Sequence, residues 1–314
     1  MPFVLAVHGG AGTISREVAD AGPFHAGLRD ALEAGAAVLR AGGSALDAVQ
    51  AAVACLEDCP LFNAGRGSVY TSDARHEMDA ALMEGTHLRA GAVAGVHGVR
   101  NPVELARRVM EASGAVLLAG EGAQRFAAEQ GVRMEPAAYF HTEQRLAQLR
   151  IVQAGGSREA ALDHAVPVPD APLDESRKFG TVGAVARDAH GRLAAAVSTG
   201  GMTNKRPGRV GDSPLVGAGL YANDASCAVS ATGTGEHFIR AVAAYEVHAR
   251  MRHRGETLVQ AAHAAVHDAV GALGGEGGLI AVDAAGNVAM PFNSRGMYRG
   301  VLREGGEAET AIFA

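Results

Sequence analysis

Apolar positions at the start of the chain predict a short buried strand followed by helices. Residues 3–7 (FVLAV) form a continuous apolar run that ends in the glycine-dense stretch HGGAG, as expected for a strand that enters a loop. Residues 24–40 repeat apolar side chains at helical spacing and stop before a pair of glycines. Ser44 and Asp47 then have the spacing of a helix cap, and a further apolar helix face follows them.

The middle of the chain continues this alternation and then loses it. Asn101 and Pro102 predict a helix start with an asparagine cap. Further segments are expected as a buried strand at 115–120 and helices at 121–130 and 142–153. From about 154 to 180, prolines and charges replace the periodic pattern, which is typical of a flexible linker.

After the linker, apolar runs on either side of His190 and Gly191 predict an antiparallel hairpin. A glycine-rich loop follows, and then a strand at 227–233. Helices are expected at 235–251, with Phe238, Ile239, Val242 and Tyr245 facing inward, and at about 257–270. The closing segment predicts strands that are interrupted near residues 285 and 293.

Hairpins imply antiparallel pairing and argue against a doubly wound parallel sheet. Stacked antiparallel sheets with helices on both outer faces would satisfy all of these segments. We therefore expect an α+β fold, a four-layer αββα sandwich.

Composition narrows the classes of function. The 314 residues include 42 glycines and 48 % hydrophobic but only 4 % aromatic residues, which fits a closely packed interior of small side chains. A net charge of −6 argues against a nucleic-acid surface. No stretch approaches the length of a membrane span, and the N-terminal apolar run lacks the basic segment of a signal peptide. We expect a cytoplasmic protein with neither nucleic acid nor membrane as a partner.

Several common site motifs are missing from the sequence. The three cysteines predict neither a disulfide framework nor a zinc site. No P-loop, dinucleotide fingerprint or G-x-S-x-G motif is present. His263 and His267 have a metal-compatible spacing, but no glutamate follows the first histidine. We interpret them as a pair on a partly exposed helix.

A set of threonines at strand ends remains: Thr181, Thr199 and Thr232. Thr181 is either an ordinary β-branched residue at a strand start or a nucleophile made by cleavage of the Gly180–Thr181 bond. Cleavage would give Thr181 a free α-amine with a reference pKa of roughly 7.7–8.0, which could act as the base for its own hydroxyl. Glycine at position 180 would let that peptide adopt the strained geometry of the attack.

Glycine-rich segments could complete an acyl-transfer site. The stretch TGTG at 232–235 offers a hydroxyl and backbone N–H groups for a developing oxyanion. Arg209 and Asp212 lie close together in a glycine-containing loop and match the α-carboxylate and α-amine of an amino acid. A local surface ion pair would explain the same two residues, and the spacing leaves both interpretations open.

Long segments of the chain resemble the plant-type L-asparaginase / isoaspartyl aminopeptidase family. They are HGGAGTI, FNAGRGSVYTSDARHEMDAALMEG, GTVGAVARD, STGGMTNKRPGRVGDSPLVGAGLYA and ATGTGEHFIR, and they follow the order of the family. The resemblance implies a single N-terminal-nucleophile (Ntn) hydrolase domain over 1–314. It also implies an inactive precursor that cleaves itself into 1–180 and 181–314, and a dimer of cleaved αβ protomers.

The matching motifs imply a role for each site residue. Thr181 would be the nucleophile, released by cleavage after Gly180, and Thr199 would be the neighbouring hydroxyl that supports it. The remaining roles would fall to Thr232 and Gly233 as the oxyanion hole, Arg209 for the substrate α-carboxylate, Asp212 and the Gly235 carbonyl for the α-amine, and Asn63 as a contact from the other fragment.

The stretch LEDCPLFNAGR resembles the alkali-cation loop of the family. The resemblance implies a structural sodium ion, since carbonyl oxygens suit a hard cation. Its ligands would be the backbone carbonyls of Leu56, Glu57, Cys59, Phe62, Ala64 and Arg66. No cofactor is expected for catalysis.

The expected activity is hydrolysis of the side-chain amide of L-asparagine and of β-aspartyl dipeptides, which releases L-aspartate through a β-aspartyl ester on Thr181. One alternative is a glycosylasparaginase, although no glycosylation sequon or signal peptide is found. Others are a non-catalytic amino-acid-binding protein and a metal-dependent hydrolase. The sequence leaves the balance between asparagine and dipeptides open.

Overall fold

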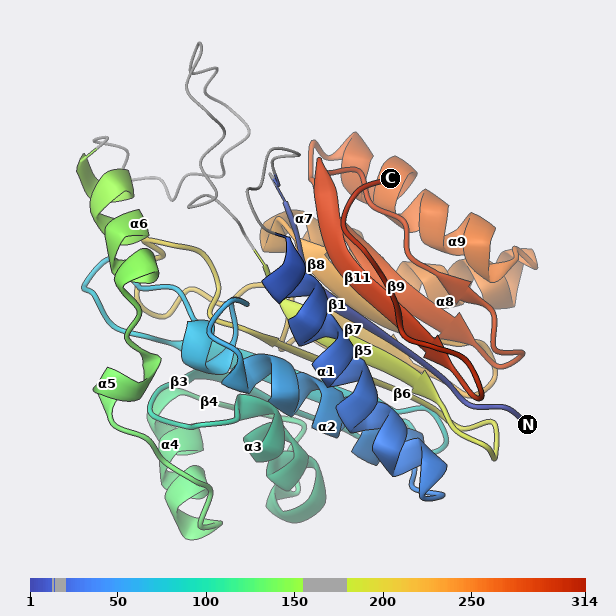
Figure 1. The fold of residues 1–314 in the computed structure, drawn as a ribbon, viewed down its shortest axis with the longest axis horizontal. Helices are drawn as coiled ribbons and strands as arrows, with labels where there is room; N and C mark the ends of the chain where they lie inside the picture. The colour runs from blue at the N-terminus through green and yellow to red at the C-terminus, as the bar shows by residue number, and fades with distance from the viewer. Residues whose placement is uncertain (13, 15–20, 155–179) are drawn as a thin grey trace.

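The computed structural model describes residues 1–12, 14, 21–154 and 180–314. Within them the chain forms an α+β fold in which stacked sheets carry helices on their outer faces (Figure 1). The four-layer sandwich expected from the sequence is confirmed. The expected linker, apart from its first and last residues, lies outside the described residues.

The larger sheet has eight strands. In spatial order they are β12 (Glu309–Ala311), β11 (Gly296–Arg303), β1 (Val4–Gly12), β5 (Val182–Arg187), β6 (Leu193–Thr199), β2 (Met78–Glu84), β3 (Ala90–Val96) and β4 (Leu117–Ala119). The smaller sheet has four, ordered β10 (Val288–Ala289), β9 (Gly277–Asp283), β8 (Cys227–Gly233) and β7 (Leu220–Ala222). Pairing is antiparallel except between β3 and β4, which run parallel.

The helices separate into groups by the face they cover (Figure 1). The large sheet carries α1 (Gly22–Arg40), α2 (Ala45–Asp58) and α3 (Pro102–Arg108). The small sheet carries α7 (Gly235–Ala241), α8 (Ala243–Arg254) and α9 (Leu258–Ala264). Beside the β3–β4 edge lies α4 (Gly120–Glu129), whereas α5 (Ala137–Phe140) and α6 (Glu143–Ala154) lie against the loop at 61–67. Short turns of other helix types are η1 (Gly65–Gly67), η2 (Val109–Ser113) and η4 (Ala265–Val270).

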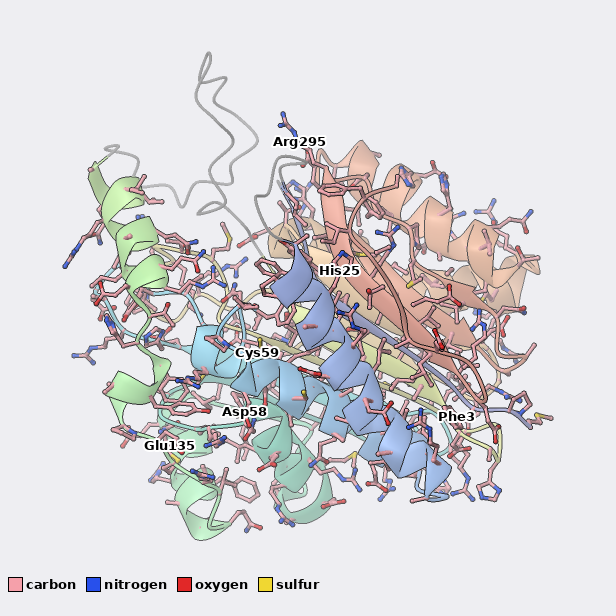
Figure 2. All side chains as sticks on the ribbon, in the orientation of Figure 1. Phe3, His25, Asp58, Cys59, Glu135 and Arg295 are labelled. Atoms are coloured by element: carbon pink, nitrogen blue, oxygen red, sulfur yellow. The ribbon has the colours of Figure 1, made fainter. Side chains whose placement is uncertain are left out.

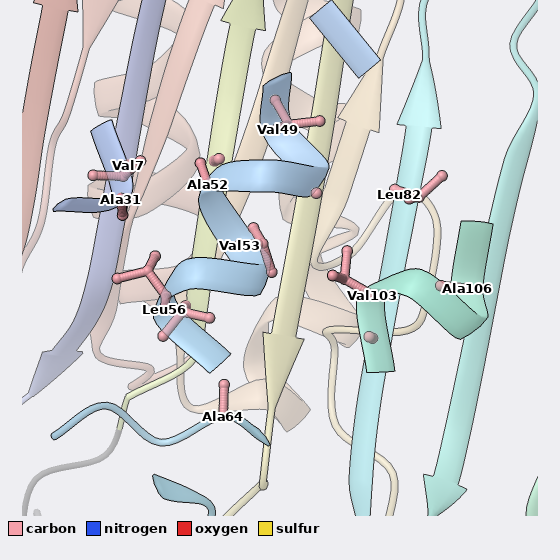
Figure 3. Close-up of a cluster of buried hydrophobic side chains, with 14 of the residues drawn as sticks. Val7, Ala31, Val49, Ala52, Val53, Leu56, Ala64, Leu82, Val103 and Ala106 are labelled. Carbon is pink, nitrogen blue, oxygen red and sulfur yellow. The ribbon is translucent and has the colours of Figure 1, made fainter. Parts of the chain in front are cut away.

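Apolar side chains fill each space between the layers. Figure 3 shows the first cluster, in which Val53 and Leu56 of α2 and Val103 of α3 belong to one buried group with residues of the large sheet. A second cluster, which includes Val185 and Ile280, lies between the two sheets, and a third lies under α8 and α9. Burial of this apolar surface is the main force that holds the layers together.

The hairpin predicted around Gly191 is confirmed and has a defined register. Strands β5 and β6 pair antiparallel with Val182 opposite Ser198. The next position outward in this register places Thr181 opposite Thr199. Residues that are well separated in the sequence therefore become neighbours at one end of the large sheet.

Some expectations for the first half differ from the structure. Strand β1 does not stop at residue 7 but continues to Gly12, with a register shift between His8 and Gly10. The expected buried strand at 115–120 is the shorter β4, where Leu117 is 40 % exposed because it lies at the sheet edge. Asn101 occupies the N-cap position of α3, but its side chain donates to Ala54 O instead of capping the helix.

The single helix expected at 235–251 is broken. Val242 adopts φ +48°, which ends α7 and starts α8 in a new direction. As a result Val242 and Tyr245 are 46 % and 38 % exposed, and Ala244 and Val247 face the core in their place. The prediction that Val242 and Tyr245 point inward was wrong, because it assumed one continuous helical face.

No helix within the described ranges is long and apolar enough to cross a membrane.

Candidate functional site

Thr181 lies directly before β5 in a buried position. Its side chain is only 8 % exposed, and its hydroxyl oxygen lies 3.4 Å from the hydroxyl oxygen of Ser213. The preceding Gly180 packs on β1, since a Cβ at this position would lie 3.1 Å from the carbonyl oxygen of Gly9. Gly180 therefore lies against β1, and Thr181 lies beside the loop that carries Ser213.

A buried polar bridge supports the strand behind Thr181. The Ser230 hydroxyl of β8 donates to the Ala196 carbonyl at 3.1 Å and lies 3.0 Å from His8 Nε2. Burial lowers the pKa of His8 to about 3, so its imidazole is neutral at pH 7. The bridge occupies the space next to Gly183, where a Cβ would lie 2.1 Å from Ser230 Oγ and 2.5 Å from His8 Nε2. Only glycine fits there, because any other side chain would displace the bridge.

Asn63 fixes the end of strand β6, next to Thr199. Its Nδ2 donates to the Gly201 carbonyl at 2.7 Å, and its backbone carbonyl accepts from Gly200 N–H at 3.1 Å. Its Oδ1 accepts from Val69 N–H at 3.0 Å, which locks the side chain. The Thr199 hydroxyl accepts from Gly201 N–H at 2.9 Å. The structure therefore brings together Asn63 and Thr199, which come from opposite sides of the expected cleavage point.

Thr232 and Gly233 lie at the end of β8 in the smaller sheet. The Thr232 side chain is buried, and its hydroxyl accepts from Ala11 N–H of β1 at 3.3 Å. Gly233 pairs with Gly277, and a Cβ on Gly233 would lie 2.4 Å from the Glu276 carbonyl oxygen. The close approach of these backbones requires glycine at position 233.

The side chains of Arg209 and Asp212 both approach the start of α7. A Cβ on Gly235, the first residue of this helix, would lie 2.9 Å from Asp212 Oδ1 and 3.1 Å from Arg209 Nη2. Only glycine fits at 235, because a Cβ there would crowd both the Asp212 carboxylate and the Arg209 guanidinium. Arg209 makes its ion pair with Glu236, at 2.9 Å from both Nε and Nη2.

Asp212 is a buried carboxyl group that is only partly satisfied. It is 3 % exposed, and its Oδ2 has no hydrogen-bond partner in the described part of the chain. Burial raises the pKa of Asp212 to about 7, against the opposing effect of the Arg209 charge. An ammonium group placed beside Oδ2 would supply the missing partner and stabilise the ionised form.

Comparison with known proteins identifies the family of the chain. A family model described as asparaginase matches residues 1–312. The chain belongs to the asparaginase family. Membership of this family makes the protein a hydrolase.

Individual relatives match the chain over almost its whole length. An isoaspartyl peptidase of Salmonella typhimurium is 56 % identical over 313 residues, which cover 99 % of this chain and 98 % of the relative. An isoaspartyl peptidase of Escherichia coli is 53 % identical, with 99 % and 96 % covered. An isoaspartyl peptidase/L-asparaginase of Bos taurus is 39 % identical, with 97 % and 94 % covered.

The structure of this asparaginase-family chain adds residues that the sequence reasoning missed. Ser213 is 1 % exposed and its hydroxyl lies 3.4 Å from that of Thr181, in addition to Thr199, which lies opposite Thr181 in the β5–β6 register. The position of Ser213 directly after Asp212 was the one available signal. Lys205 is also buried, and its Nζ donates to the Glu77 carbonyl at 2.8 Å. Nothing in the sequence marks this lysine, because a lysine in a glycine loop is normally solvated.

The expected cation loop forms a tight turn after α2, whose end is marked by Asp58 and Cys59 in Figure 2. Most of the expected ligands, the carbonyls of Leu56, Cys59, Phe62 and Ala64, accept backbone N–H groups within the turn and keep a second lone pair. Burial raises the pKa of Glu57 to about 8, so this side chain adds no charge at pH 7. Neutral oxygen donors of this kind fit a monovalent hard cation.

The histidine pair singled out in the sequence lies on the far side of the small sheet. The rings of His263 and His267 stack at 4.0 Å between centroids. Within the described ranges, no group of three or more His, Cys, Asp or Glu side chains could hold a metal ion. The pair remains the surface feature that the sequence analysis expected.

Proposed function

We propose that this protein is an autoprocessing threonine hydrolase that cleaves the side-chain amide of L-asparagine and of β-aspartyl dipeptides and releases L-aspartate. The names of the relatives, isoaspartyl peptidase and isoaspartyl peptidase/L-asparaginase, support this substrate class. One observation carries the proposal. The Thr181 hydroxyl lies 3.4 Å from Ser213, the residue that follows Asp212, so a nucleophile adjoins a site suited to an amino-acid head group.

Processing would begin with attack of Thr181 Oγ on the Gly180 carbonyl carbon. The Thr181 nitrogen leaves that carbon and takes a proton, so the peptide becomes an ester. Water then hydrolyses the ester, which leaves a carboxylate on Gly180 and a free amine on Thr181. The packing of Gly180 against Gly9 and the burial of Thr181 restrict the motion of this peptide, which supports an attack within the folded chain.

The same hydroxyl would then act on substrate. The free amine takes the proton from Oγ, which attacks the side-chain carbonyl. Ammonia, or the amine of the second residue in a dipeptide, leaves with that proton and a β-aspartyl ester remains. Water hydrolyses the ester and regenerates Thr181. Thr232 and the backbone at Gly233 lie in the facing sheet, where donors could stabilise the oxyanion.

Substrate recognition would use the charges around Gly235. The Arg209 guanidinium binds the α-carboxylate, and Asp212 accepts from the α-amine together with the Gly235 carbonyl. The closeness of both side chains to Gly235 supports this assignment, because a carboxylate and a guanidinium approach the same backbone position. Thr199 and Asn63 hold the strand end against which the nucleophile rests.

We extend the proposal to the cation loop and to assembly. A sodium ion held by the carbonyls of the loop after α2 would stiffen the segment that carries Asn63, and it would take no part in bond cleavage. The active form would be a dimer of cleaved αβ protomers. Sodium-dependent melting of the purified protein tests the first statement, and light scattering tests the second.

The decisive experiment follows the chain itself. Purified protein should separate into fragments 1–180 and 181–314, and N-terminal sequencing of the smaller one should begin at Thr181. Thr181→Ala should leave a single chain that releases no aspartate from asparagine or a β-aspartyl dipeptide. A Thr181→Ala protein that still splits and still releases aspartate would overturn the proposal.

A further inference from the structure

The Arg209–Glu236 ion pair leaves only part of the guanidinium available. Glu236 Oε1 and Oε2 accept from Nε and Nη2 at 2.9 Å each, so this carboxylate binds one edge of the fork. The Arg209 side chain is 18 % exposed and that of Glu236 is 47 % exposed. A guanidinium has five N–H donors, and those on Nη1 together with the second one on Nη2 are not used by Glu236.

The remaining edge of Arg209 faces glycines. A Cβ on Gly211 would lie 2.9 Å from Nη1, and a Cβ on Gly235 would lie 3.1 Å from Nη2. The same Cβ on Gly235 would lie 2.9 Å from Asp212 Oδ1. Arg209 Nη2 and the buried carboxyl group of Asp212 therefore both lie next to the Gly235 backbone.

We infer that Glu236 is a positioning residue that holds Arg209 away from Asp212, so that an amino-acid zwitterion can bind between them. This inference rests on the proposed function and adds a residue to its substrate-binding part, which is formed by Arg209 and Asp212. The substrate carboxylate binds end-on to Nη1 and Nη2 while Glu236 keeps the Nε edge. Lysine could not replace Arg209 here, because a single ammonium cannot offer two carboxylates separate edges.

The physical reason lies in the unsatisfied Asp212. Its Oδ2 lacks a partner among the described residues, and Arg209 is three positions away in the same loop. Without Glu236, the guanidinium would gain most by turning to Asp212, since a buried carboxylate and an arginine form a strong bidentate pair. That internal pair would remove both charges that the substrate needs.

The test uses Glu236→Ala and Glu236→Gln in fully processed enzyme. We expect Glu236→Ala to raise KM for asparagine about tenfold and Glu236→Gln about threefold, with kcat within about twofold, because the misplaced group binds substrate and does not touch the reacting bond. Glu246→Ala is the matched control. It breaks the Arg250–Glu246 pair on α8, whose side chains are similarly exposed at 15 % and 33 %, and KM should not change.

A second readout separates positioning from simple loss of structure. The charged groups near Asp212 are Arg209 in its loop, Glu236 on α7 and Asp79 on β2. Loss of the Glu236 charge and pairing with Arg209 would each lower the Asp212 pKa, so in Glu236→Ala the acid limb of kcat/KM should move to lower pH. In an Arg209→Ala background, Glu236→Ala should add no further change, as expected for residues that act as one unit.

The outcomes separate this inference from the proposed function. If Arg209→Ala raises KM but Glu236→Ala does not, the inference about Glu236 is wrong and the proposed role of Arg209 in substrate binding is retained. If Arg209→Ala leaves KM for asparagine unchanged, the proposed role of Arg209 in substrate binding is wrong, and the inference about Glu236 is wrong with it. A loss confined to kcat, or an equal further loss in the Arg209→Ala background, would also overturn the role assigned to Glu236.

Discussion

The two ends of the proposed site are built in different ways. At the nucleophile end, Thr181 and Thr199 take their places from the register of β5 and β6, and the bridge from His8 to Ser230 joins the two sheets behind them. At the substrate end, Arg209 and Asp212 belong to a loop and face the first turn of α7. The first end depends on close packing of small groups, and the second depends on balanced charge.

This difference predicts different kinds of sensitivity. A change of volume at the nucleophile end should disturb the sheets and therefore lower stability. A change of charge at the substrate end should leave the fold intact and weaken binding. The following experiments test whether the nucleophile end responds in stability and the substrate end in binding, from the largest expected effect to the smallest.

Asp212→Asn should have the largest effect and should act on substrate binding. We expect kcat/KM for asparagine to fall by about 30-fold or more at pH 8, since truncation of one partner of a buried charge pair costs about 2–5 kcal/mol. Steady-state kinetics measures this loss, and the exposed Asp30→Asn on α1 is the control. A large fall in the melting temperature of Asp212→Asn would contradict the claim that charge changes at the substrate end leave the fold intact.

Gly183→Ala should destabilise the protein. The new methyl group would lie 2.1 Å from Ser230 Oγ and 2.5 Å from His8 Nε2, so the bridge between the sheets must move. We expect a loss of about 1–3 kcal/mol in the free energy of unfolding, measured by urea titration, as is typical of overpacking. Gly122→Ala on α4, where a Cβ meets no atom within 4 Å, should be neutral or slightly stabilising. Equal stability of both variants would count against a packed bridge.

The pH dependence of kcat/KM should differ between a substrate that has an α-amine and one that lacks it, because only the first uses Asp212. Burial raises the pKa of Asp212 to about 7, so below that pH the carboxyl group becomes protonated and loses the charge that, in the proposed function, would hold the substrate ammonium. The acid limb for asparagine should therefore be steeper, by about a factor of ten per pH unit below pH 7, than the limb for succinamate, which lacks the α-amine. With succinamate only the Thr181 amine should titrate. Identical profiles for the two substrates would contradict the role of Asp212.

Ser213→Ala should have the smallest effect, and the loss should appear in kcat. Removal of the hydroxyl that lies 3.4 Å from Thr181 Oγ costs one hydrogen bond, or about 0.5–1.5 kcal/mol, which corresponds to roughly a two- to tenfold slower turnover. Single-turnover kinetics on processed enzyme would show this change, with Ser294→Ala as a control serine outside the site. A rise in KM at constant kcat would move Ser213 to the substrate end.

Much of the fold followed from the sequence, because apolar periodicity and turn residues are local signals. The hairpin at Gly191, the helices α1, α2, α4 and α6, and strand β8 appear close to the predicted positions. The failures occurred where tertiary packing overrides local pattern. The glycine stretch after His8 joined β1 because it pairs with β11, and the helix from Gly235 broke at Val242, whose left-handed backbone no propensity scale would assign to valine.

The candidate site was also predictable only where local sequence features mark a residue. Thr181, Arg209 and Asp212 were named from the sequence, since residue type, glycine context and family motifs point to their chemistry. Ser213, Glu236 and the Ser230–His8 bridge were not found, because their importance comes from which distant residue they contact.

The sequence by itself determined the layered fold, the family and the candidate nucleophile, because these depend on local periodicity and on long contiguous motifs. Only the tertiary structure showed that the Ser213 hydroxyl also lies next to Thr181 and that the Glu236 carboxylate holds Arg209. Both contacts join segments whose distance depends on strand register and on the packing of one sheet against the other. Register and packing arise from the whole chain, so no short segment of the sequence encodes these contacts.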